Sequence, residues 1–403
     1  MRTVLKDTKA SDIPQDWKIA RLSEHCGLRQ GTYIKPEEMV ESGFPVYGAN
    51  GVIGNARSYM HTDRTVLVSC RGANCGVVHF TMPNSWVNNN SIALEPKSHF
   101  VDPQYLYYHL SRTSFNAEIT GSAQPQIVVG VLGLKEIVIP PLPEQRKIAE
   151  ILSTVDGTIE KTDTIIQKTQ QLKKGLLQNL LTEGIGHNQF KETAIGRIPE
   201  EWEIAQLGDL GEFFKGKTIT QSDIIATGLP CIRYGDIYVQ YENDHIVTDF
   251  SAYISRETAE NGRRIYSGDI LFAGTGETVE DIGKCVAYTR DDEAYAGGDL
   301  IVFRPEGKNQ LNSIFLSYCL NSGEVAKWKS RLGQGSSIFH IYAKNLKTLI
   351  VPVPSVNEQH KIAEIFCEVD AKIKTEQAFK SEVEQLKKGL MQVLLTGKVR
   401  VKV

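Results

Sequence analysis

The sequence lacks the long apolar run of a membrane protein and the cysteine spacing of a disulfide or zinc scaffold. It has no stretch of about 18 apolar residues, and its first residues, MRTVLKDTKASDIP, lack the apolar core of a secretory signal. The seven cysteines are odd in number and never spaced C-x-x-C, so we expect reduced packing residues. These absences predict a cytoplasmic protein without a metal site.

Catalytic motifs are scarce as well. Residues 211–218 fit the phosphate-binding pattern G-x-x-x-x-G-K-[ST], but Phe213 and Phe214 fill the loop, and the flanking segments are a poor strand and a poor helix start. Residues 272–276, FAGTG, resemble a glycine loop for adenosylmethionine, but no base-binding N-P-P-Y tetrad accompanies them. We therefore expect a protein that is not an enzyme and has no cofactor, with a P-loop ATPase as the alternative.

Positive charge is not in excess. The chain has 45 Lys and Arg against 48 Asp and Glu, a net charge of -3. Residues 1–143 carry 13 basic and 12 acidic side chains, and residues 183–357 carry 17 and 24. Any surface that binds a polyanion must be a local patch, or must be completed by a partner.

What the sequence does contain is a duplication. Its 403 residues, 41% hydrophobic and 23% charged, suit two or three globular domains. Residues 13–22, IPQDWKIARL, match residues 198–207, IPEEWEIAQL, at an offset of 185. Residues 144–182 match residues 358–396 at an offset of 214, with 20 of 39 positions identical. Each half of about 200 residues thus begins and ends alike, around a middle that differs.

The repeated 39-residue element is predicted to be a helix. Its apolar residues recur every three or four positions, Pro143 and Asn357 lie at helix starts, and Gly184 and Gly397 follow the last apolar residues. Each helix would be about 58 Å long, which favours pairing of the two helices over two helices lying on separate cores. The contact between the two helices is called the seam below. The residues expected there are Ile148, Val155, Leu172, Leu176, Ile362, Val369, Leu386 and Leu390.

The regions between the repeats are predicted to be mixed α/β. Strands are expected at 65–70, 77–80, 91–94, 269–274, 284–288 and 300–303, and helices at 103–110 and 312–320. Loops rich in Gly, Asn, Gln and Ser occur at 84–91, 120–126 and 333–337, and such loops carry contacts more often than packing. The predicted domains are 1–143, 144–183, 184–357 and 358–403.

The segments P-L-P-E-Q-R-K-I-A-E-I-L (141–152) and N-E-Q-H-K-I-A-E-I-F (357–366), each leading into Q-L-K-K-G-L, carry a resemblance. With I-P-x-x-W opening each half, the chain resembles the specificity subunits of type I restriction–modification systems over essentially its whole length. The resemblance implies an α+β fold with two target-recognition domains, separated by two long helices that pair antiparallel. It also implies partners: double-stranded DNA, modification subunits, two in number by our expectation, and restriction subunits, which carry the chemistry.

Two similar but non-identical readers on a pseudo-two-fold frame suit a bipartite, asymmetric DNA site. Base edges would be read by Arg, Lys, Asn, Gln, Ser, Thr or His on loops. In the first domain the candidates are Arg29, Arg57, Arg71, Asn74, Asn88, Asn89, Asn90, Gln124 and Gln126. In the second domain they are Lys215, Lys217, Arg233, Arg263, Arg264, Gln334, Ser336, Ser337 and His340. A structural coiled-coil adaptor remains a further alternative, since composition alone does not identify base contacts.

Overall fold

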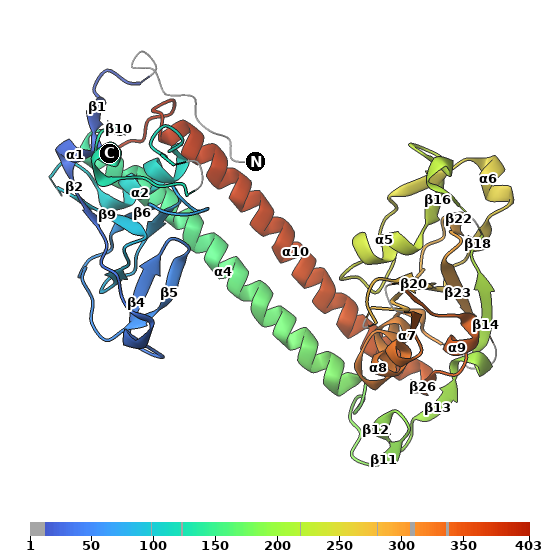
Figure 1. Ribbon diagram of the computed structural model, residues 1–403. Helices are drawn as coiled ribbons and strands as arrows, with labels where there is room; N and C mark the ends of the chain where they lie inside the picture. The colour runs from blue at the N-terminus through green and yellow to red at the C-terminus, as the bar shows by residue number, and fades with distance from the viewer. Residues whose placement is uncertain are drawn as a thin grey trace. The chain divides into compact units, whose positions relative to one another are not determined.

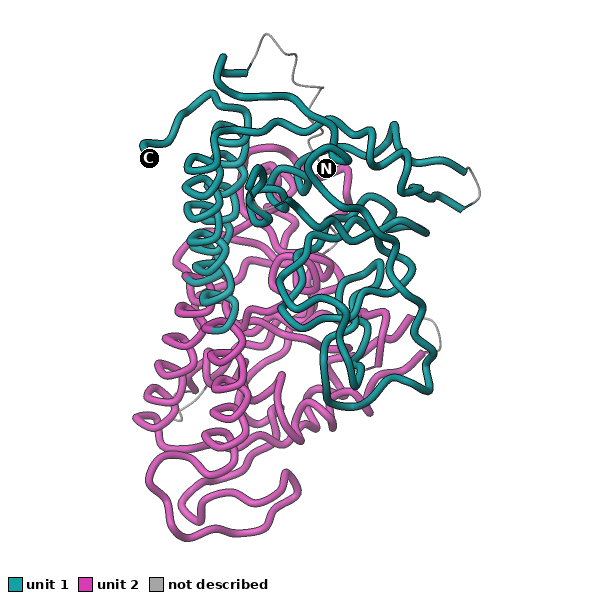
Figure 2. Tube along the Cα trace, turned by 90° about the vertical axis from the view of Figure 1, so that its left-hand side faces the viewer, with its two compact units in different colours: residues 1–164, 376–403 teal, residues 165–375 magenta. Residues whose placement is uncertain are grey.

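The computed structural model describes residues 13–97, 99–121, 124–217, 219–279, 281–306, 311–335 and 338–403. The chain forms two compact units: unit 1 holds residues 1–164 and 376–403, and unit 2 holds residues 165–375. Each unit combines one globular domain with segments of both long helices (Figure 2). Within the described ranges, no helix has the length and apolarity required to cross a bilayer.

The two repeated elements are the long helices α4 (Leu142–Leu180) and α10 (Val356–Leu394), 39 residues each. Helix α4 begins one residue before Pro143, and α10 begins one residue before Asn357, the two predicted helix starts. The predicted stop signals are confirmed, because Gly184 and Gly397 have φ values of 65° and 70°, a left-handed conformation that glycine adopts readily after a helix.

The helices run antiparallel within each unit. In unit 1, Asp156 on α4 lies 2.5 Å from Lys387 on α10, and Asp163 lies 2.7 Å from Lys380. As α4 advances by seven residues, its partner on α10 steps back by seven. In unit 2, Lys173 and Asp370 make the corresponding pair at 2.6 Å. Helix pairing is therefore confirmed.

The phase of the predicted seam is wrong at Leu172 and Leu386. Both leucines are 55% exposed, because the neighbouring Lys173 and Lys387 are the residues that reach the opposite helix. The other six predicted seam residues are buried or half-buried. A strict seven-residue repeat drifts around a helix of 3.6 residues per turn, so counting by heptads misplaces these two positions.

The globular domain of unit 1 contains two four-stranded sheets and a short two-stranded one (Figure 1). The first sheet has the order β2 (Cys26–Gln30), β9 (Ser91–Pro96), β6 (Val66–Ser69), β7 (Val78–Phe80). The second has the order β3 (Met39–Val40), β5 (Gly51–Ala56), β4 (Phe44–Gly48), β8 (Trp86–Val87). Strands β1 (Lys18–Arg21) and β10 (Glu136–Ile139) pair antiparallel.

Unit 2 repeats the order of both four-stranded sheets, with one strand added at the edge of the second, although its sequence differs. One sheet has the order β14 (Gly211–Lys215), β23 (Leu300–Pro305), β19 (Ile270–Ala273), β21 (Cys285–Ala287). The next has the order β15 (Ile224–Ile225), β17 (Ala252–Ile254), β16 (Leu229–Ile232), β22 (Ala294–Ala296), β18 (Arg263–Ile265). Smaller sheets pair β13 (Glu203–Gln206) with β26 (Ile350–Val353), β11 (Phe190–Thr193) with β12 (Gly196–Pro199), and β20 (Thr275–Gly276), β25 (Phe339–His340) and β24 (Gln334–Gly335).

Shorter helices complete the two domains. They are α1 (Leu22–His25), α2 (Pro103–Arg112) and α3 (Val129–Gly133) in unit 1, and α5 (Tyr234–Val239), α6 (Arg256–Glu260), α7 (Ser313–Leu320), α8 (Gly323–Arg331) and α9 (Ala343–Leu346) in unit 2. The strands and helices predicted between the repeats are all present. The α+β class with two mixed domains and an internal duplication is thus confirmed.

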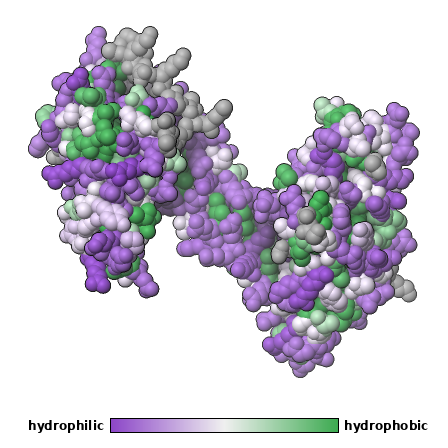
Figure 3. Space-filling model, viewed as in Figure 1, coloured by the Kyte–Doolittle hydropathy of each residue, from purple (hydrophilic) through white to green (hydrophobic). Residues whose placement is uncertain are grey.

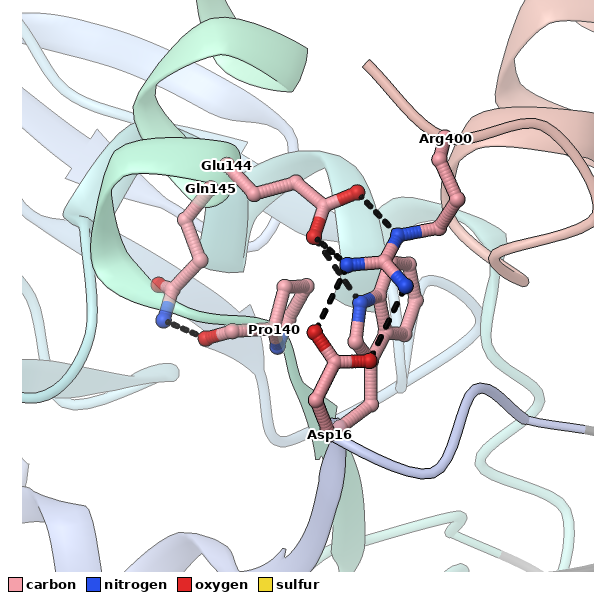
Figure 4. A network of polar contacts seen from close by, with 6 residues as sticks. Asp16, Pro140, Glu144, Gln145 and Arg400 are labelled. Atoms are coloured by element: carbon pink, nitrogen blue, oxygen red, sulfur yellow. Dashed lines mark hydrogen bonds and ion pairs between the residues drawn. The ribbon is translucent and has the colours of Figure 1, made fainter. Parts of the chain in front are cut away.

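The repeated glutamate of the E-Q motif anchors a tryptophan in each unit. The indole N–H of Trp17 donates to Glu144 at 3.0 Å, and that of Trp202 donates to Glu358 at 3.0 Å. In unit 1 the guanidinium of Arg400 lies between Glu144 and Asp16 (Figure 4). The I-P-x-x-W and E-Q repeats are therefore two sides of one contact, and Arg400 joins the C-terminal segment to it.

The following glutamine ties the start of each long helix to its own domain. Gln145 donates to the carbonyl of Pro140 at 2.8 Å and accepts from the N–H of Asp102 at 2.9 Å. Gln359 repeats both contacts with Pro354 and Asn312, at 2.9 Å each. Because these buried amides are satisfied by backbone groups, the helix starts are fixed against the domains.

Candidate nucleic-acid interface

In unit 2, the residue after β19 joins three distant segments. The N–H of Gly274 donates to the carbonyl of Asp299 at 2.8 Å, and the carbonyl of Gly274 accepts from Ile341 at 3.0 Å. Beside this point Thr275 pairs with His340. We call these five residues the second junction.

Unit 1 contains the same connectivity. The N–H of Cys70 donates to the carbonyl of Asn90 at 2.8 Å, and the carbonyl of Cys70 accepts from Ile127 at 3.0 Å. Arg71 forms a bridge with Gln126 in the place of Thr275 and His340. We call these five residues the first junction. The strands predicted at 65–70 and 269–274 thus end at equivalent residues, Cys70 and Gly274.

Each junction carries a short hairpin from one of the loops singled out in the sequence. Thr120 pairs with Gln126 in unit 1, and Gln334 pairs with His340 in unit 2. Both hairpins need glycine at their second position, because a Cβ on Gly335 would lie 2.0 Å from the carbonyl oxygen of Ile338. The hairpins therefore share a backbone design while their side chains differ.

Two adjoining cavities open beside the second junction. One, of about 580 Å³, is lined by Lys215, His340 and Tyr342 among others. The other, of about 1130 Å³, is lined by Lys217 and Arg233 among others. Lys215, Gly298 and Asp299 line both cavities, so the two form one groove, the second groove. Four sequence-predicted residues, Lys215, Lys217, Arg233 and His340, are brought together there.

The phosphate-loop interpretation of residues 211–218 is wrong. Gly211–Lys215 is strand β14, paired antiparallel with β23, and so does not wrap around a ligand. Gly216 is needed for another reason, because a Cβ there would lie 1.7 Å from the carbonyl oxygen of Gly297. Its counterpart Gly31 would meet the carbonyl of Asn88 at 2.4 Å. Both glycines permit a close approach of two backbones.

In the first domain, several predicted residues lie at the first junction or next to it. Arg71, Asn90 and Gln126 belong to it, and Asn89 accepts a hydrogen bond from Gln30 through its carbonyl at 2.8 Å. The remaining positions are as follows: Gln124 is exposed on the hairpin, Asn74 is hydrogen-bonded to Asn50, Arg29 is exposed on β2, and Arg57 is exposed just after β5.

Asn88 does not present its side chain to the surface. It is 6% exposed, and its amide oxygen accepts the N–H of Asn89 at 2.7 Å. This side chain stabilises the turn instead of offering a contact, which corrects its assignment as a candidate reader.

The other candidates of the second domain lie on β18 and on the hairpin. Arg263 extends over the ring of Phe214 at 5.1 Å, and Arg264 over that of Tyr266 at 5.2 Å. Gln334 is exposed at the start of the hairpin. Ser336 and Ser337 lie outside the described residues.

Sequence reasoning missed two exposed apolar residues, Tyr234 and Val239, that line the second groove. It also missed Gln221 and Asp236, which hold Arg233. The Asp236 carboxylate raises the pKa of the Arg233 guanidinium. The only signal was the short spacing R-Y-G-D, in which Asp236 caps the start of α5 at Arg233.

The predicted role of cysteine as a packing residue fits Cys231, two residues before Arg233. Burial raises the pKa of its thiol to about 11.

The comparisons with known proteins agree with this architecture. A family described as "Type I restriction modification DNA specificity domain" matches residues 14–171 and 199–385. The two matched stretches are the two halves of the duplication and cover most of the chain. The chain belongs to this family.

Two known specificity subunits match this chain over nearly its full length. It is 26% identical to the type I restriction enzyme MjaVIII specificity subunit of Methanocaldococcus jannaschii, over 98% of this chain and 96% of the relative. It is also 26% identical to the putative MjaX specificity subunit of the same organism, over 98% and 97%. The fold is similar to that of the type I restriction–modification S subunit from M. genitalium, with a TM-score of 0.67, 18% identity, and coverage of 97% and 98%.

Proposed function

We propose that this specificity subunit reads a bipartite, asymmetric DNA site, with residues 1–143 reading one half and residues 184–357 the other. The helical segments 144–183 and 358–403 set the spacing of the two readers. The matched junctions carry this proposal: one backbone design presents Arg71, Asn90 and Gln126 in unit 1, and Thr275, Asp299 and His340 in unit 2. Because the frame is shared and the side chains differ, the two half-sites differ in sequence.

The chain itself supplies recognition, and its partners supply catalysis. Modification subunits, two in number, transfer the methyl group, and restriction subunits cleave DNA, all in the cytoplasm. The even charge balance of the chain supports this division, since phosphate contacts dominate affinity for DNA and call for an excess of Lys and Arg.

The long helices offer a matched pair of docking faces for the modification subunits. Ile165 and Leu172 are exposed on α4, and Phe379 and Leu386 are exposed at the equivalent positions of α10. Apolar patches interrupt the polar surface of the helices (Figure 3). A shallow cavity of about 470 Å³ also lies on α10 beside Gly389, where the missing side chain leaves room for a partner. Two equivalent faces suit two copies of one partner.

The test is to map adenine methylation across the genome of a host that carries its own modification subunits. The full chain should produce methylation at one split, non-palindromic motif, and deletion of the chain should abolish it. Methylation that persists without the chain, or that shows no motif, would contradict the proposal.

A further inference from the structure

Arg233 is held rigidly at the edge of the second groove. It precedes α5, and its guanidinium donates to both carboxylate oxygens of Asp236, through Nη2 to Oδ1 at 3.0 Å and through Nε to Oδ2 at 3.3 Å. A second neighbour, Gln221, accepts from Nη1 at 2.7 Å. Asp236 is buried and also accepts the backbone N–H of Arg233 at 2.8 Å. The side chain is therefore fixed before any ligand arrives.

The hydrogen-bond inventory leaves part of this guanidinium free. A guanidinium has five N–H donors in a fixed fork, and three of them are engaged by Asp236 and Gln221. One N–H on Nη1 and one on Nη2 have no acceptor among the described residues. Since Asp236 occupies the edge formed by Nε and Nη2, the free donor of Nη2 belongs to the outer edge shared with Nη1.

The surroundings of Arg233 indicate a planar partner with an apolar face. Arg233 lines the cavity of about 1130 Å³ together with Tyr234 and Val239. Tyr234 is 40% exposed and Val239 is 83% exposed, although both are large apolar side chains at the mouth of a groove. Lys215 and Lys217 lie on the same groove and are suited to the phosphates that accompany a base.

The first domain has no counterpart of this arginine. Strand β4 pairs with β8 in parallel, with Val46 opposite Trp86, as β16 pairs with β22, with Cys231 opposite Tyr295. Two residues after Cys231 comes Arg233, and two residues after Val46 comes Gly48. The frame is duplicated here and the donor is not, so this position distinguishes the two readers.

We infer that Arg233 reads a guanine in the half-site recognised by the second domain, donating to O6 and N7, with Asp236 and Gln221 as its positioning residues. This inference rests on the proposed function. Guanine presents two adjacent acceptors in the major groove, whereas adenine presents N7 beside an amino group. Two free donors on neighbouring nitrogens of a fixed guanidinium therefore favour guanine, with its two adjacent acceptors, over the other bases.

The experiment uses the full chain in complex with its modification subunits and a DNA duplex bearing the mapped motif. Each guanine of the second half-site is replaced in turn by 7-deazaguanine, which lacks the N7 acceptor, and binding is measured with the unchanged protein. One position should lose affinity by about 10-fold or more, within the range of a bidentate arginine contact. The same series is measured with Arg233→Ala, with Arg233→Lys, and with Lys217→Ala as the control.

In Arg233→Ala the penalty for 7-deazaguanine at that one position should vanish, and methylation mapping should show any base tolerated there. Lys217→Ala should weaken binding to every duplex by a similar factor. A second half-site with no guanine sensitive to N7 removal would overturn the inference, as would an Arg233→Ala complex that still discriminates at every position. Either result leaves the proposed function standing, whereas binding without any motif would contradict that function itself.

Discussion

The ammonium of Lys387 lies 2.5 Å from the carboxylate of Asp156. Tyr108 donates to the same carboxylate at 2.7 Å, so one aspartate joins both long helices and the first domain. Lys173, Asp370 and Tyr318 repeat this arrangement in unit 2, where the tyrosine donates at 2.6 Å. The duplication thus extends to individual polar contacts between helix and reader.

Breaking the contact between Asp156 and Lys387 should loosen the pairing of the two long helices in unit 1. A double-mutant cycle with Asp156→Ala and Lys387→Ala should give a coupling energy of about 1 kcal/mol, since both side chains are partly screened by water. Chemical denaturation of the four proteins measures it. The control pair Lys327 and Glu324, an exposed pair within α8, should show weaker coupling, and equal coupling in the two pairs would contradict the structural role.

The exposed residues Leu172 and Leu386 should contribute little to folding but should be essential for assembly with the modification subunits. Leu172→Asp and Leu386→Asp should change the free energy of unfolding by no more than about 0.5 kcal/mol, as is usual for surface sites. Each should abolish retention of one of the two modification subunits, because each leucine belongs to only one of the two docking faces. Ile166→Asp and Val383→Asp, buried in the seam, should instead destabilise the chain by about 3 kcal/mol. Normal assembly of both leucine variants would show that the docking faces lie elsewhere.

A fragment of residues 1–186 should form a symmetric dimer. Lys173 occupies the position in α4 that Lys387 occupies in α10, so Asp156 of one copy can meet Lys173 of the other in an isologous interface. Sedimentation should show a dimer, and with modification subunits the fragment should direct methylation to an inverted repeat of the first half-site. A soluble monomer, or methylation of a non-palindromic motif, would refute the equivalence of the two helices.

Acid should destabilise the first domain through His109. Burial lowers the pKa of His109 to about 4, and its ring nitrogen accepts the N–H of Val138 at 3.3 Å. Between pH 6.5 and about pH 4, His109 is protonated in the unfolded chain but stays neutral in the folded chain. The free energy of unfolding therefore falls by about 1.4 kcal/mol for each pH unit of acidification because of this residue. Denaturation between pH 7 and 5 should show a smaller slope for His109→Gln than for the wild type. The exposed His99 provides the control, and an equal effect of His99→Gln would contradict this assignment.

The sequence predicted the elements that follow from periodicity and repetition. The long helices, their glycine stops and the strands beside Cys70 and Gly274 were all found this way. It did not predict that the two regions between the repeats share one topology. The contacts that they share are backbone hydrogen bonds, such as that from Cys70 to Asn90, which do not depend on the identity of the side chains. It also placed Leu172 one position away from the true contact, because the inward residue there is a lysine that reaches an aspartate. Arg233 was one candidate among many until the bonds to Asp236 and Gln221 were seen.

The central claim is that two separable readers each recognise one half of a split site. Its most direct test replaces residues 24–140 with the corresponding segment of a relative that has a different specificity, and maps adenine methylation genome-wide with the same modification subunits. The account predicts that one half of the motif changes while the other half and the spacer between them stay the same. A change in both halves, or in the spacer, would contradict it.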